Sequence, residues 1–217
     1  GVRQSLGLFL EPITNFMNSG KEFFSFAIGV QAIIWGLVTF FLGILIDKFG
    51  PQKVLAFGII SFASGIFLMS NPTSEFTLFS ATTLMGFGLG GAGMATMVSI
   101  AGKVAPVNKR SLAMGLVAAA ASFGQFAVVL PTMWMNKAFG WETSLIVLAS
   151  VVIGLLIFLP LLNSTNNKSN SAQDFGNSLQ QTIMFSLREK NYILLISGFF
   201  VCGFHVTFIA LHLPADL

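Results

Sequence analysis

Long apolar runs separated by short polar stretches give the chain its dominant pattern. A bilayer core about 30 Å thick needs roughly 20 helical residues to cross it. Runs near or above that length predict membrane-spanning helices over residues 23–46, 54–70, 76–100, 112–135, 144–162 and 192–213. Residues 1–17 hold a shorter apolar stretch, which we expect to be the second half of a first helix ending near Pro12. The pattern therefore predicts an all-α membrane protein whose first helix is truncated.

Composition supports a lipid environment. Hydrophobic residues make up 54% of the chain and charged residues 9%, against about 25% charged in soluble domains. A water-soluble domain of 217 residues could not bury so much apolar surface. The chain starts at Gly1 and stops just after Pro214, which we interpret as a fragment with material missing at both ends.

The sequence lacks the residues that several classes of function require. The single cysteine, Cys202, excludes an intramolecular disulfide and is expected to be a small buried apolar residue. Cys/His clusters with metal-ligand spacing, nucleophile–base pairs and cofactor fingerprints are absent from the sequence. We therefore expect no enzymatic activity, bound metal or cofactor. We also expect no nucleic-acid partner and a monomeric protein in the bilayer.

Lysine and arginine are distributed unevenly over the predicted loops. Alternate loops place two cations, Lys21 and Lys137, on one side of the membrane. The other side carries Lys48, Lys53, Lys103, Lys109, Arg110, Lys168, Arg188 and Lys190. Because cytoplasmic loops are enriched in these residues, the second side is predicted to be cytoplasmic in a cell membrane. It includes a polar linker over residues 163–190, with a short amphipathic helix expected over 178–190.

The stretch 43–53 is the most distinctive polar segment. It reads Gly-Ile-Leu-Ile-Asp-Lys-Phe-Gly-Pro-Gln-Lys and predicts a tight turn between two spans. Asp47 would lie at the carboxyl end of a helix, where the macrodipole disfavours an anion. It therefore needs a partner, such as Lys48, Lys53 or the amino end of another helix, and that contact could open and close as helices move.

Small residues mark two other spans. Residues 86–93 read Gly-Phe-Gly-Leu-Gly-Gly-Ala-Gly, but neither a preceding strand nor a following Lys-Ser/Thr pair indicates a phosphate loop. Close approach between helices explains these glycines better. The alanines at 118–121 are likewise expected to form a packing surface.

Ionisable residues within spans are functional candidates, because the bilayer centre penalises charge. Arg3 keeps its proton and offers a planar fork that matches a carboxylate. Its alternative is a structural ion pair, although Glu11 lies eight positions away, about 80° round the helix, which makes direct pairing awkward. His205 could carry a proton or hydrogen-bond between helices. His212 and Glu11 are candidates for coupling or for a gate near the external surface.

Further polar and aromatic side chains are candidates for lining a cavity. They are Gln31, Trp35, Gln125 and Trp134. Trp134 fits an interfacial aromatic belt equally well.

Two levels of family resemblance follow from these motifs. Gly43, Asp47, Lys48, Gly50 and Lys53 form the pattern Gly-x3-Asp-(Lys or Arg)-x-Gly-x2-Lys. This pattern resembles the loop between the second and third helices of the major facilitator superfamily of secondary transporters. The order of spans is similar to the first half of a twelve-helix member. That resemblance implies an N-terminal bundle over residues 1–162, the linker over 163–190, and helix 7 over 191–217 as the start of a C-terminal bundle.

A narrower resemblance concerns the subfamily. Residues 1–13, 109–115 with Ser122-Phe-Gly124 and Pro131, and 203–205 with 212–214 are similar to bacterial relatives of monocarboxylate transporters and oxalate/formate antiporters. The resemblance implies alternating access for a small organic anion, coupled to a proton or a counter-anion. Arg3 would hold the carboxylate, His205 would carry the proton or help bind, and Asp47 with Lys48 would belong to a cytoplasmic latch. Gln52 departs from the family pattern, which often has a second basic residue there.

Other functions remain open at this stage. An efflux antiporter for drugs or other amphipathic compounds is compatible with the Gly-rich helix, although an arginine inside a span argues against cationic drugs. A non-transporting membrane sensor or scaffold with the same fold is the third reading.

Overall fold

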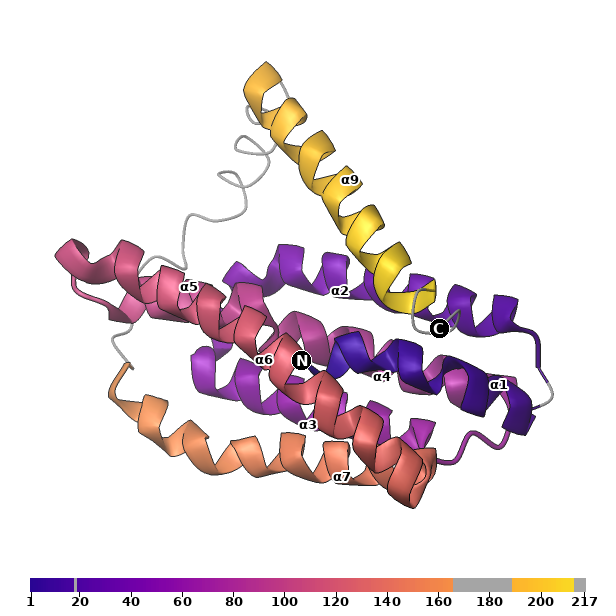
Figure 1. Cartoon of the computed structure of the whole chain (residues 1–217). Helices are drawn as coiled ribbons and strands as arrows, with labels where there is room; N and C mark the ends of the chain where they lie inside the picture. Colours follow the sequence, from indigo (N-terminus) through magenta and orange to yellow (C-terminus); the bar gives the residue numbers. More distant parts are fainter. Residues whose placement is uncertain (18, 166–188, 213–217) are drawn as a thin grey trace. The chain divides into compact units, whose positions relative to one another are not determined.

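A computed structural model of the chain describes residues 1–17, 19–165 and 189–212. The chain divides into two compact units, Gly1–Asn166 and Asn167–Leu217, and each is described by itself. Within the described ranges the regular structure is helical throughout (Figure 1). The amphipathic helix expected over 178–190 lies almost wholly outside the described residues, as does most of the expected linker.

The first unit contains six helical rods that correspond to the first six predicted segments. In chain order they are η1 (Val2–Phe9) with α1 (Leu10–Met17), α2 (Lys21–Phe49), α3 (Pro51–Met69), α4 (Glu75–Ala92) with α5 (Met94–Val104), α6 (Arg110–Phe139) after the short η2 (Val107–Lys109), and α7 (Trp141–Gly154) with η3 (Leu155–Thr165). In the second unit, α9 spans Lys190–His212.

Five helices among the described residues are long and apolar enough to cross a membrane. They are Lys21–Phe41, Pro51–Met69, Glu75–Val104, Val107–Phe139 and Trp141–Pro160. The predicted all-α membrane protein is therefore confirmed. The exposed apolar side chains of α6, such as Leu116, Phe123 and Phe126, are those expected of a surface that faces lipid.

The first helix does not end near Pro12, as the sequence predicted. It continues to Met17, because Pro12 is the third residue of α1, in the first turn, where a helix tolerates proline. Proline lacks the N–H that would bond the carbonyl of Leu8. The side-chain amide of Asn136 on α6 donates to that carbonyl at 3.4 Å instead. A side chain of the neighbouring helix α6 thus pairs with the carbonyl that the proline leaves without a backbone donor.

The predicted turn within residues 43–53 is shorter than expected, since helices occupy all of the stretch except Gly50. That residue has φ 82° and ψ 154°, and its N–H donates to the carbonyl of Ile46 at 2.9 Å. Pro51 then starts α3, a position that suits its missing N–H. Gly140, with φ 84° and ψ 163°, makes the same one-residue turn between α6 and α7. Only glycine adopts this backbone conformation readily, so the two turns depend on it.

Glycines on two sides of α4 allow its neighbours to approach closely, as the sequence predicted. Toward α3, a methyl group at Gly91 would lie 2.8 Å from the Cα of Gly58. Toward α2, a methyl group at Gly86 would lie 2.9 Å from the backbone oxygen of Gln31. The contacts of α4 with α3 and α2 are the most extensive in the unit, and α7 lies along α3 (Figure 1).

The fourth span is broken, although the sequence predicted one helix over 76–100. Gly93 has an extended backbone, and α5 begins after it. The hydroxyl of Thr96 donates to the carbonyl of Gly90 at 3.0 Å, so a buried side chain satisfies a group freed by the break. The break accompanies a change of partner, because α4 packs against α2 and α3 whereas α5 packs mainly against α6.

The alanines expected to form a packing surface differ in burial, and the surface stays a prediction. Ala118 and Ala121 are half-buried, whereas Ala119 and Ala120 are exposed on α6.

We predict that Gly50→Ala lowers the free energy of unfolding by about 1–3 kcal/mol, because alanine would be strained at this backbone conformation. Thermal unfolding of the purified full-length protein in detergent measures the change. Gly36→Ala is the matched control, since the added methyl group would have no atom within 4 Å. Equal stability of the two variants would contradict the prediction.

Gly91→Ala tests the contact between α3 and α4. The added methyl group would overlap the backbone of Gly58, and such overpacking costs about 1–3 kcal/mol. The same unfolding measurement should therefore show a lower melting temperature than for Gly36→Ala. A melting temperature equal to that of the control would mean that α3 and α4 do not depend on close backbone approach.

Candidate functional site

Arg3 and Trp35 form the contact at the centre of the candidate site. Arg3 lies in η1 and Trp35 lies on α2. The guanidinium carbon is 4.8 Å from the centroid of the indole ring, and both residues are partly buried. A cation over an aromatic face is stabilised by about 2 kcal/mol when it is shielded from water. The structure thus brings together two residues that the sequence marked separately, one as an anion ligand and one as a cavity residue.

Helix 1, the rod formed by η1 and α1, is also held by polar contacts with α6. The side-chain amide nitrogen of Gln4 donates to the side-chain oxygen of Gln125 at 3.4 Å. The bond from Asn136 to the carbonyl of Leu8 joins the same two helices further along. Consecutive residues of η1 therefore contact different helices, with Arg3 directed to α2 and Gln4 directed to α6.

Two polar side chains of the first unit are fully buried. Gln31 on α2 and Ser5 on η1 each have 0% exposure. Neither the amide of Gln31 nor the hydroxyl of Ser5 has a hydrogen-bond partner among the described residues. Each such group costs about 1–3 kcal/mol when it stays unpaired. Sequence reasoning marked Gln31 but missed Ser5, which the run of polar residues Arg3-Gln4-Ser5 could have indicated.

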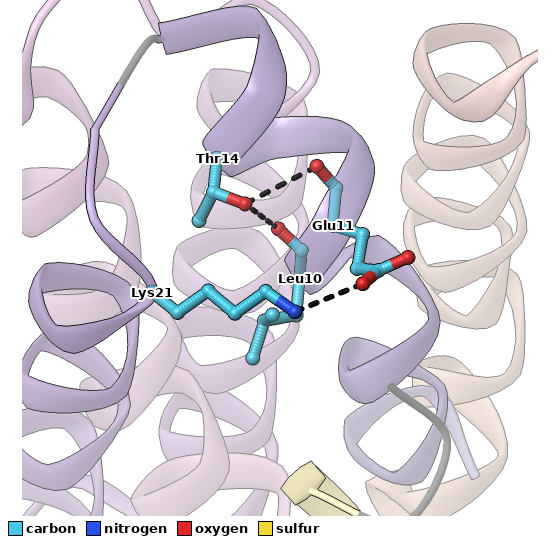
Figure 2. Close-up of polar contacts among 4 residues, drawn as sticks. All are labelled: Leu10, Glu11, Thr14 and Lys21. Carbon is cyan, nitrogen blue, oxygen red and sulfur yellow. Dashed lines mark hydrogen bonds and ion pairs between the residues drawn. The ribbon is translucent and has the colours of Figure 1, made fainter. Parts of the chain in front are cut away.

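Glu11 pairs with Lys21 at the end of helix 1. The ammonium of Lys21 donates to a carboxylate oxygen of Glu11 at 2.9 Å, and the two side chains are 58% and 53% exposed (Figure 2). Nearby, the hydroxyl of Thr14 donates to the carbonyls of Leu10 and Glu11 at 2.8 and 3.2 Å. The ion pair joins helix 1 to the start of α2, and its exposure limits its contribution to about 1 kcal/mol or less.

The two histidines belong to the second unit. His205 is exposed on α9, and its position relative to Arg3 is not determined, so a shared site stays a prediction. His212 is the last residue of α9, and its side chain lies outside the described residues. The expectation of a buried Cys202 is wrong: the thiol is exposed, because α9 is the only helix described in its unit.

Trp134 is exposed on α6. Its side chain is 65% exposed, and its ring meets Phe139 edge to face with centroids 5.9 Å apart. Both interpretations of the residue, in an aromatic belt or lining a cavity, therefore stay predictions.

The charged stretch between α2 and α3 is partly described. Asp47 lies in the last turns of α2, and its side chain, like any contact of Gly43, lies outside the described residues. The ammonium of Lys48 is 5.3 Å from the centroid of the Phe49 ring, and Lys53 is exposed. The partner predicted for Asp47 therefore stays a prediction.

Gln52 connects this stretch to η3. Its side-chain nitrogen donates to the carbonyl of Leu159 at 3.0 Å. Leu159 also packs against a buried apolar cluster formed by Ile46, Val54, Leu55 and Ile100. The ends of α2, α5 and η3 and the start of α3 thus meet around one small core.

Comparison with known proteins decides the family. The chain matches the Major Facilitator Superfamily over residues 2–215. It belongs to that superfamily. Members are transporters rather than enzymes, so this major facilitator chain is a multi-span membrane protein of a transporter family.

Three curated relatives illustrate the similarity. The uncharacterized MFS-type transporter YcxA of Bacillus subtilis (strain 168) is 26% identical over 97% of this chain and 52% of its own length. The agnestins efflux protein AgnL12 of Paecilomyces divaricatus is 27% identical over 81% of this chain and 38% of its own length. The vesicular acetylcholine transporter of Drosophila melanogaster is 31% identical over 66% of this chain and 26% of its own length. The chain thus spans at most about half the length of these relatives, and no solved structure matches it significantly.

Gln52 is a departure from the pattern of the superfamily. The major facilitator pattern often has a basic residue at this position, whereas here a neutral amide bonds the backbone of Leu159. The amide thus joins α3 to η3 without adding a charge to the stretch that holds Asp47 and Lys48.

A double-mutant cycle on Glu11→Gln and Lys21→Gln tests the surface ion pair. We expect a coupling energy of about 0.2–1 kcal/mol, measured by unfolding of the full-length protein, because both groups are exposed. The coupling should weaken at high salt. A coupling above about 2 kcal/mol would contradict a surface pair.

Proposed function

We propose that the full-length protein is a secondary transporter that carries small organic anions of the monocarboxylate type by alternating access. The observation that supports this most directly is the guanidinium of Arg3 on η1, 4.8 Å from the indole ring of Trp35, which lies in the membrane-length helix Lys21–Phe41. A permanent charge at membrane depth is costly, and such residues mark substrate pathways. The planar fork of arginine binds a carboxylate through two parallel hydrogen bonds. A small carboxylate is thus the substrate class that fits the group.

Coupling is the second part of the proposal. His205 on α9 would carry a proton, or help to bind the anion, once the two bundles of the full-length protein enclose a central cavity. Histidine suits this role because its charge changes near physiological pH. A counter-anion moving in the opposite direction would replace the proton in an exchanger. Glu11 or His212 would then contribute to coupling or to an external gate.

The remaining assignments follow the family architecture. Residues 1–162 would form the N-terminal bundle, 163–190 a cytoplasmic linker, and 191–217 the first helix of a C-terminal bundle. Asp47 with Lys48 would belong to a latch that closes the cytoplasmic side. The protein would act as a monomer in the cell membrane, and lipid would cover its outer surface.

Efflux of amphipathic compounds is a second candidate function. One relative is named as an efflux protein for agnestins, which favours export of organic compounds by this fold. Arg3 favours an anionic compound among them. Both candidates share the anion site and differ in the size of the substrate and the direction of transport, whereas a non-transporting sensor would move none of these compounds.

Arg3→Gln tests the proposed site in proteoliposomes that contain the full-length protein. Wild type should take up labelled lactate, pyruvate or oxalate, and the variant should lose about 10- to 100-fold of that uptake, because a hydrogen bond to a charged group contributes about 1.5–3 kcal/mol. Lys137→Gln, which removes an exposed cation near the end of α6, is the control and should keep normal uptake.

Two results would overturn the proposal. Failure of wild type to move any of these anions, with or without a pH gradient, would remove carboxylate transport. Normal uptake by Arg3→Gln would remove Arg3 from the binding site.

A further inference from the structure

The connection between α5 and α6 carries two exposed cations, Lys109 and Arg110. Neither takes part in an ion pair within the described part of the chain. The sequence also provides no acid nearby, because residues 76–141 contain four lysines and arginines but no aspartate or glutamate. The two positive charges can therefore meet an anion that is not part of these helices.

The length of α6 brings its ends to the headgroup layers of a bilayer. Only residues 105–106 separate the membrane-length segments Glu75–Val104 and Val107–Phe139, so the connection lies at a membrane surface. Arg110 and Lys137, in the first and last turns of α6, are about 40 Å apart at 1.5 Å per residue. A bilayer with its headgroups is about 40–45 Å thick. The cations at the start of α6 thus lie at the level of lipid phosphates.

The connection has a fixed shape. Ala105 and Pro106 are extended, with ψ 141° and 147°. The N–H of Lys109 then donates to the carbonyl of Pro106 at 2.9 Å. The flanking helices pack closely, since a methyl group added at Gly102 would lie 3.2 Å from the sulfur of Met114. A rigid support of this kind lowers the entropy lost when a ligand binds.

Exposed apolar side chains adjoin the two charges along the chain. Val107 is 85% exposed, and Leu112 and Leu116 are 63% and 62% exposed. The two leucines are four residues apart and share one face of α6. Cations at the headgroup level, followed by an exposed apolar face, match the two parts of a phospholipid, which are its phosphate and its acyl chains.

We propose that this connection binds an anionic phospholipid. Lys109 and Arg110 hold the phosphate of the headgroup, and the acyl chains cover Leu112 and Leu116. A zwitterionic lipid has the same phosphate, but its headgroup also carries a positive charge, which the two side chains repel. Two cations near the membrane surface should give a preference for anionic lipid of about 10- to 30-fold. This binding does not depend on the identity of the transported substrate.

Quenching of tryptophan emission by brominated lipid measures binding at this place in the protein. The full-length protein would carry Leu116→Trp and no other tryptophan. Position 116 lies about 9 Å along α6 from Arg110, at the level of the acyl chains. The protein is placed in vesicles of phosphatidylglycerol and phosphatidylcholine with equal acyl chains, and either lipid is brominated. Phosphatidylglycerol should bind about 10- to 30-fold more tightly, and the preference should fall at high salt.

Charge variants of this reporter protein separate the two cations from the others. Replacing both residues by glutamine, Lys109→Gln with Arg110→Gln, should reduce the preference about 10-fold or more. The exchange Lys109→Arg with Arg110→Lys should keep it, because both charges remain. Lys137→Gln, which removes an exposed cation at the other end of α6, is the matched control and should also keep it.

Melting temperature in phosphatidylcholine separates lipid recognition from folding. The neutral double variant should melt at the same temperature as the reporter protein, because both replaced side chains are exposed. A large fall would overturn the proposal by showing that the two cations stabilise the protein itself.

Three quenching results would also overturn it. Equal quenching by the two lipids in the reporter protein would mean that anionic lipid is not recognised there. A preference that persists in the neutral double variant, or that Lys137→Gln loses to the same extent, would mean that other cations cause it. Quenching by neither lipid would mean that protein, rather than lipid, covers this face of α6.

Discussion

Close contact between helix backbones is the constraint on which the first unit depends. In lipid, apolar side chains gain little by meeting each other, so helices associate through van der Waals packing and small residues. The fourth span provides that packing on two sides, with Gly91 against Gly58 of α3 and Gly86 against Gln31 of α2. The glycines therefore fix α2, α3 and α4 as one block. Where the span changes partner, at Gly93, its helix breaks and α5 packs with α6.

Helix 1 is attached by different means. Its contacts in the bundle include Arg3 over Trp35, Gln4 with Gln125, and the carbonyl of Leu8 with Asn136. Polar contacts of this kind are directional, and other polar groups can replace them, whereas glycine contacts have no substitute. The first helix, which carries Arg3 and Gln4, is thus attached by contacts that can be exchanged for others. This division explains why the candidate site lies along helix 1.

Much of the fold could be predicted from the sequence, because a helix that crosses lipid needs about 20 mostly apolar residues in a row. The spans and the close approach around residues 86–93 required only apolar length and small residues. The sequence could not predict that the first helix continues past Pro12 or that the fourth span breaks at Gly93. Both features depend on which neighbouring helix supplies a hydrogen bond or a packing surface. The tight turn in the stretch 43–53 was predicted, but not that Gly50 alone makes it, because the spans were expected to end at residue 46 and to resume at residue 54.

For the site, the sequence identified residue types but not their partners. Arg3 was marked by its charge and Trp35 by its ring, yet their contact joins two helices and is set by tertiary packing. Gln31 was marked as a cavity residue, but its complete burial follows from the approach of α4. Ser5 was missed because a single serine is common in membrane helices, although it continues the polar run of Arg3 and Gln4. The position of His205 relative to these residues depends on how the two units are arranged, which is not determined.

Tryptophan emission measures the central claim most directly, because Trp35 lies under the guanidinium that is proposed to hold the substrate. The full-length protein would carry Trp35 as its only tryptophan and be titrated with lactate, and with choline as a cation of similar size. The account predicts a saturable change with lactate, no change with choline, and loss of the lactate response in Arg3→Gln. A lactate response that is absent, or that persists unchanged without the arginine, would contradict it.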